Sequence, residues 1–143
     1  MAHDPTADLV FEALAHAIDG NASEAATALM TIGQASDDNR MYGVCCAIAS
    51  AGTHALSLVY GDRAPKPGTS DMYVLQELKP GAIDGDPPKA FAVRFLTAYA
   101  NGDTATCMAL FNAALRSSDD EYVSSVCALL ADVAGIYRLA LDR

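Results

Sequence analysis

The chain has 143 residues, enough for one domain with a single core, and its apolar share of 52% and charged share of 19% are globular values. The formal net charge of −9, with no Lys or Arg before Arg40, disfavours binding to nucleic acid or to an anionic membrane. No apolar run approaches the length of a membrane span of about 18 residues, and the acidic N-terminus lacks a secretion signal, so we expect a cytoplasmic protein.

The first half of the sequence carries the start and stop signals of helices. We expect three helices there: 5–19, 22–35 and 37–60. Asp4 before Pro5 is typical of a helix start, and Gly20 suits the left-handed residue that ends a helix. Asn21 is expected to cap the second helix and Ser36 the third. The third helix should bury one stripe: Met41, Val44, Cys45, Ile48, Gly52, Ala55 and Val59.

Residues 62–85 interrupt this pattern with a segment rich in Pro and Gly, which predicts a long linker that crosses the bundle. Within it Met72–Leu78 is the strand-like run. It is compatible with a strand that pairs with a second subunit, or with one turn of helix capped by Ser70, and we favour the helical turn.

The second half again predicts three helices: 87–101, 104–117 and 119–142. Asp86 before Pro87 repeats the helix start, Gly102 repeats the stop, and Ser118 with Glu121 has the spacing of a capping box. The last helix should bury a matching stripe: Val123, Val126, Cys127, Leu130, Ala134, Tyr137 and Leu141.

At an offset of 82 residues the two halves share ten identities over 58 pairs, residues 4–61 against 86–143, mostly at positions that begin or end helices. Ser36-Asp37-Asp38 corresponds to Ser118-Asp119-Asp120, and Val44-Cys45 corresponds to Val126-Cys127. We therefore expect an all-α fold: one domain over 1–143, a helical bundle of about six helices built from two similar three-helix units, 4–61 and 86–143. Two unrelated helical halves that share common capping chemistry are the alternative.

Surplus apolar residues on the last helix suggest an interface. A helix that is apolar on nearly all sides is either central or in contact with a partner. We expect a homodimer, with a monomer as the alternative. The candidate interface residues combine this surface with the acidic face of the first helix: Asp8, Glu12, Tyr122, Leu129, Ile136 and Leu139.

The sequence offers no constellation for catalysis. His16 and His54 have no partner at i+3 or i+4 that would form a metal pair, and Asp84-Gly85-Asp86 lacks the remaining ligands of a calcium loop. Cys45 and Cys46 are best explained by packing. We expect no catalytic, cofactor-binding or metal-binding residue, and hence no enzyme.

Two hypotheses for function remain. The first is a non-enzymatic protein-interaction or adaptor module of the cytoplasm whose acidic face meets a basic protein partner. The second is a small-ligand-binding sensor with a pocket between the two helical units, lined by Tyr99, Tyr137 and the cysteines.

Overall fold

The computed structural model describes residues 6–63, 73 and 85–142, which form six α-helices and one short 3₁₀ turn. The elements are α1 Thr6–Ile18, α2 Ala22–Gln34, α3 Asp38–Tyr60, η1 Gly61–Arg63, α4 Pro87–Ala100, α5 Thr104–Arg116 and α6 Asp119–Leu141. The described residues contain no strand, so the all-α bundle predicted from the sequence is confirmed. Most of Met72–Leu78 lies outside the described residues, and its conformation stays a prediction.

Side chains at the helix starts satisfy main-chain N–H groups much as the sequence suggests. The N–H groups of Lys89 and Glu121 donate to the side chains of Asp86 and Ser118, at 3.2 and 3.1 Å. In α3, however, the cap is Asp37, which accepts from the N–H of Arg40 at 2.8 Å, so the prediction of a Ser36 cap was wrong by one residue.

Of two further features of the helix ends, the expected cap at Asn21 is missing and the expected glycine turns are present. Asn21 stands at the start of α2, but its side chain makes no capping hydrogen bond. Gly20 and Gly102 have φ angles of 83° and 75°, the left-handed conformation that glycine adopts without strain. The chain therefore turns sharply between α1 and α2 and between α4 and α5.

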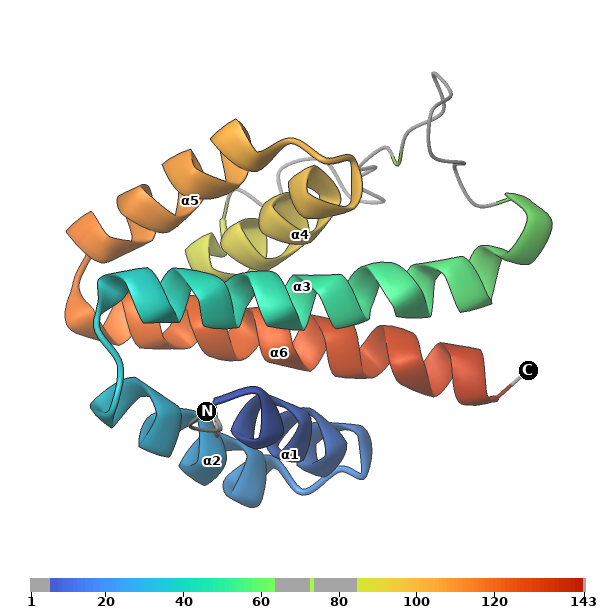
Figure 1. Ribbon diagram of the computed structural model, residues 1–143, viewed down its shortest axis with the longest axis horizontal. Helices are drawn as coiled ribbons and strands as arrows, with labels where there is room; N and C mark the ends of the chain where they lie inside the picture. The colour runs from blue at the N-terminus through green and yellow to red at the C-terminus, as the bar shows by residue number, and fades with distance from the viewer. Residues whose placement is uncertain (1–5, 64–72, 74–84, 143) are drawn as a thin grey trace, which may run out of the picture.

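The two long helices α3 and α6 lie side by side at the centre and begin at the same end of the bundle (Figure 1). The hairpin of α1 and α2 lies on one side of this parallel pair, and the hairpin of α4 and α5 lies on the other. α6 packs against α3, α4 and α1, so it is covered on more sides than any surface helix. This position explains why α6 is apolar over most of its circumference.

The predicted stripe of α3 is confirmed, because six of its seven residues are buried and Val59 is half-buried. The predicted stripe of α6 was partly wrong. Val123 and Leu141 are exposed, and the buried face includes Leu129 and Val133 instead. The reason is the packing of α4 against α6, which covers a face that the comparison with α3 had assigned to the surface.

The two halves have the same helix order and similar helix lengths. α2 and α5 begin and end 82 residues apart, and α3 and α6 have 23 residues each. The corresponding side chains are not equally buried, since Cys45 is inaccessible and Cys127 is half-buried. Descent of the halves from one duplicated unit stays a prediction.

Tyr73 is the described residue inside the connection that lies apart from both halves in sequence, and it is held at the end of α4. The Tyr73 N–H donates to Asn101 Oδ1 at 2.7 Å, and Asn101 Nδ2 donates to the Tyr73 carbonyl at 2.8 Å. The Tyr73 ring also lies 6.1 Å from the ring of Tyr60. These contacts fix one point of the connection beside the C-terminal ends of α3 and α4.

By length and hydropathy alone, Asp38–Arg63 and Asp119–Leu141 could each cross a membrane, although the core helices of a soluble bundle pass the same test. Within α6, Asp132 forms an ion pair with Lys89, at 2.7 Å between Oδ1 and Nζ. The pair joins the middle of α6 to the first turn of α4.

Candidate functional site: a groove between α2 and α6

The residues predicted as an interface do not come together in the structure. Asp8 and Glu12 are exposed on α1, whereas Tyr122 is half-buried at the start of α6. Leu129 is fully buried, so it cannot reach a partner, and its assignment to an interface was wrong. Ile136 is half-buried and Leu139 is 62% exposed. Because each residue of an α-helix rises 1.5 Å, Tyr122 and Leu139 stand about 25 Å apart along α6.

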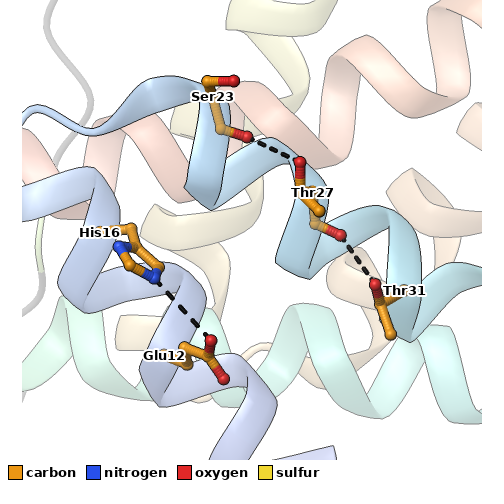
Figure 2. A network of polar contacts seen from close by, with 5 residues as sticks. All are labelled: Glu12, His16, Ser23, Thr27 and Thr31. Atoms are coloured by element: carbon orange, nitrogen blue, oxygen red, sulfur yellow. Dashed lines mark hydrogen bonds and ion pairs between the residues drawn. The ribbon is translucent and has the colours of Figure 1, made fainter.

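The acidic side of α1 borders a shallow polar groove between α1 and α2 (Figure 2). His16 Nε2 lies 3.8 Å from Glu12 Oε1 within α1. On α2, the hydroxyls of Thr27 and Thr31 donate to the carbonyls four residues earlier, each at 3.0 Å. These hydroxyl protons are used within the helix, and the remaining polar side chains of the groove include the carboxylates of Glu12 and Glu24 and the imidazole of His16.

A deeper, mostly apolar hollow of about 460 Å³ lies where the second half of α2 meets the first turns of α3 and α6. Leu29 and Met30 come from α2, Met41 from α3, and Val123 and Val126 from α6. Met30 is 59% exposed and Val123 is 51% exposed, although both side chains are apolar. Among the described residues of the lining Asp38 is the charged one, and none of them is Lys or Arg. The hollow is therefore an apolar surface with a carboxylate at its mouth.

A second hollow of about 340 Å³ continues along the same two helices toward the start of α2. The two hollows share Ala26, Leu29 and Cys127, and together we call them the α2–α6 groove. The second hollow is lined largely by alanines of α2 and α6. Its far end carries Arg138, whose Nη1 donates to the carbonyls of Ala17 and Ile18 at 2.8 and 3.3 Å.

The groove lies where α2 carries smaller side chains than α5 does at the corresponding positions. Ala26, Leu29 and Gly33 line it, and Met108, Phe111 and Leu115 stand 82 residues later. On the second side the ring of Tyr42 lies 6.3 Å from Phe95 and 5.5 Å from Phe111, so aromatic rings fill the space between α3 and α5. The corresponding space between α6 and α2 stays partly open.

Tyr122 forms the wall between the groove and this aromatic cluster. Its ring lies 6.0 Å from that of Phe111, and its hydroxyl is buried without a hydrogen-bond partner among the described residues. Burial raises the pKa of the Tyr122 hydroxyl to about 12, with smaller contributions from Cys45 and Asp38. The hydroxyl is neutral at physiological pH, and the groove wall carries no negative charge there.

The cysteines are placed for packing rather than for nucleophilic chemistry. Burial raises the pKa of the Cys45 thiol to about 12 and that of Cys107 to about 11, and it also raises the pKa of Cys46 and Cys127. Reactive thiols need the opposite shift. Among the described residues no group of three or more His, Cys, Asp or Glu side chains is arranged to hold a metal ion.

Sequence reasoning placed a pocket between the two halves, and the first hollow lies there, between α2 and α3 of one half and α6 of the other. The lining was only partly foreseen, because Cys127 contributes to it but Tyr99 and Tyr137 do not. The signal that could have located the groove is the difference in side-chain size between α2 and α5, since small residues facing a central helix leave space.

A third hollow of about 480 Å³ lies at the opposite end of the long helices, between α3, α4 and α6. Ile136 and Leu139 line it together with Tyr60 and Tyr73, and the Lys89–Asp132 pair forms its polar edge. Two of the predicted interface residues thus belong to a different surface from Tyr122 and from the acidic face of α1. No protein family, curated protein or solved structure matches this chain.

Proposed function

We propose that this protein is a non-enzymatic interaction module of the cytoplasm that binds a basic protein partner. The observation that carries the proposal is the α2–α6 groove, an exposed apolar surface whose mouth is acidic. Exposed apolar surface of this kind, rimmed by polar groups, is typical of protein interaction sites.

The charge of the chain supports a basic partner. The net charge is −9, and the exposed residues Asp8, Glu12 and Glu24 add to an N-terminal region without Lys or Arg before Arg40. Such a surface speeds association with a cationic protein and repels nucleic acid. Binding should therefore weaken as the salt concentration rises.

A charge-reversal pair tests this proposal. Asp8→Lys with Glu12→Lys reverses the acidic face of α1, and Asp62→Lys with Asp142→Lys makes the same change in net charge at exposed sites elsewhere. We expect affinity capture from the native host to lose its basic partner with the first variant and keep it with the second. Capture of no basic protein, or loss of the partner by both folded variants, checked by circular dichroism, would contradict the proposal, and retention by both would place the contact at the Asp38 end of the groove instead of on α1.

We also propose a homodimer, supported by the exposed apolar residues at the C-terminal ends of the long helices. Leu58 and Tyr60 of α3 are exposed, as are Leu139 and Leu141 of α6. Size-exclusion chromatography with light scattering should give twice the chain mass of 14.9 kDa. A single-chain mass at all concentrations would leave the interaction module as a monomer.

A small-ligand sensor is the second candidate, because the 460 Å³ hollow lies between the two halves and has the size of small-molecule sites. A bound metabolite should raise the melting temperature by mass action. A thermal-shift screen of a broad metabolite set that finds no stabilising compound would count against this candidate.

A further inference from the structure

We infer that the α2–α6 groove binds one short amphipathic helix of a partner protein, with Lys or Arg residues beside its apolar stripe. This inference rests on the proposed interaction function and specifies which kind of partner segment the groove binds. The two hollows adjoin along α2, whose 13 residues span about 20 Å. A groove of that length matches a helix of three to four turns better than it matches a compact metabolite.

The lining suits a helix in two respects. The exposed alanines of the second hollow, including Ala26 and Ala131, allow the backbone of a guest helix to approach closely. In the first hollow, exposed Met30 and Val123 provide apolar contact area, and methionine adapts to side chains of different shape. Leucine or phenylalanine side chains at i, i+3, i+4 and i+7 of the guest would cover this lining.

The charges around the groove indicate which charge the guest helix carries and which end of the groove its charged residues occupy. Asp38 lines the mouth of the first hollow, and Asp119 stands one turn before Val123 on α6, at the same end of the bundle. At the far end Arg138 is already bound to two carbonyls of α1. Cationic residues of the guest therefore belong beside Asp38. A second copy of this chain, itself at −9, is a poor guest for the acidic end.

A designed peptide tests the inference directly. The probe is a fluorescent peptide of about 14 residues made of Leu and Lys, with Leu at helical spacing on one face. The control peptide has the same composition in an order that destroys the face. Fluorescence anisotropy in about 0.15 M salt should show that the amphipathic peptide binds at least about tenfold more tightly than the control.

Matched methionine variants locate the binding site. Met30→Lys places a cation in the groove, and Met108→Lys makes the same change on α5, where Met108 is 53% exposed and outside both hollows. We expect Met30→Lys to weaken peptide binding by about tenfold or more and Met108→Lys by less than about twofold. Met30→Ala removes the apolar contact without adding charge and should weaken binding by a smaller factor.

The half-buried thiols give an independent readout. Cys127 lines both hollows, whereas Cys46 of α3 is also half-buried but lines neither. Saturating peptide should slow the alkylation of Cys127 by about fivefold or more, because the thiol reacts only in molecules whose groove is empty. The alkylation rate of Cys46 should stay unchanged. Mass spectrometry of the two modified peptides measures both rates in one sample.

Several results would overturn the inference. Equal binding of the two peptides, or equal losses for Met30→Lys and Met108→Lys, would mean adsorption through net charge alone. A dimer that Met30→Lys converts to a monomer would place a second copy in the groove. A basic host protein that is still captured by Met30→Lys, but not by Asp8→Lys with Glu12→Lys, would uphold the proposed function and move its site to α1.

Discussion

A Cβ atom on Gly52 of α3 would lie 2.7 Å from Cδ1 of Leu96 of α4. It would also lie 2.8 Å from Cγ2 of Val133 of α6. Three helices thus meet at a position where no side chain fits, and both neighbours are buried. The close approach of α3 to the other two helices depends on this glycine.

Gly52→Ala should therefore destabilise the fold, although alanine is the better helix former. Overpacking of a buried site costs about 1–3 kcal/mol, which exceeds the gain in helix propensity of about 1 kcal/mol. Gly43→Ala in the same helix is the control, because nothing lies within 4 Å of its added Cβ. Urea unfolding should show a lower free energy of unfolding for Gly52→Ala and a higher one for Gly43→Ala. A higher free energy of unfolding in both variants would show that the side chains of Leu96 and Val133 move aside for the added methyl group.

Arg138→Ala should loosen the attachment of α1 to α6. The guanidinium group donates to two carbonyls at the C-terminal end of α1, and a hydrogen bond from a charged donor contributes about 1.5–3 kcal/mol, less at an exposed site such as this one. We expect a loss of about 1 kcal/mol in the free energy of unfolding and faster amide exchange in α1. Arg138→Lys keeps the charge but not the paired contact, so its loss should be intermediate. Wild-type exchange in Arg138→Ala would contradict this role.

Tyr122→Phe should leave the protein as stable as before or make it more stable by up to about 1 kcal/mol, because a buried hydroxyl without a partner carries a desolvation cost. The ring contact with Phe111 remains in this variant. Tyr122→Ala removes the ring as well and should cost about 3 kcal/mol or more. Thermal unfolding compares the three proteins. A loss above about 1 kcal/mol for Tyr122→Phe would reveal a hydrogen bond to the hydroxyl.

Stability should fall at alkaline pH because the buried thiols resist ionisation. The Cys45 pKa is raised from 9.0 to about 12, so above pH 9 the unfolded chain binds fewer protons than the folded one. The contribution of the neutral Cys45 thiol to the free energy of unfolding is fully present below pH 9 and is lost as the pH rises toward 12. For Cys45 alone the slope reaches about 1.4 kcal/mol per pH unit.

Cys45→Ala tests this pH dependence. The variant starts from a lower stability, because it leaves a small cavity, but its stability should fall less steeply between pH 9 and 11. Val44→Ala leaves a cavity in the same buried stripe without a titrating group, and its slope should equal that of the wild type. Urea unfolding over a pH series gives all three slopes. Parallel curves for Cys45→Ala and the wild type would mean that the thiol does not carry the effect.

Local signals in the sequence predict the helices well. Asp86, Ser118 and Gly102 fix helix ends through short-range hydrogen bonds and backbone conformation, which depend on adjacent residues alone. The stripe on α3 follows from periodicity in the same way. Leu129 shows where this reasoning stops, because its burial depends on which helix covers α6, and α4 comes from more than 20 positions earlier in the chain.

The candidate groove was harder to predict than the helices. A pocket between the halves was expected, but its position results from what is absent, namely side chains larger than Ala26 and Leu29 on the face of α2 that lines it. Periodicity marks Leu29 as buried without showing that the space beside it is incompletely filled. Leu129 was assigned to an interface for a related reason, since apolar character alone cannot distinguish a buried helix face from an exposed one.

The parallel course of α3 and α6 gives the molecule an electrical polarity along its long axis. Peptide dipoles of two helices that begin at the same end add, with about half a positive charge at each N-terminus. Asp37 and Asp38 at one start and Asp119, Asp120 and Glu121 at the other outweigh that partial charge. The protein should therefore turn this end toward any positively charged surface that it approaches, before a single contact forms.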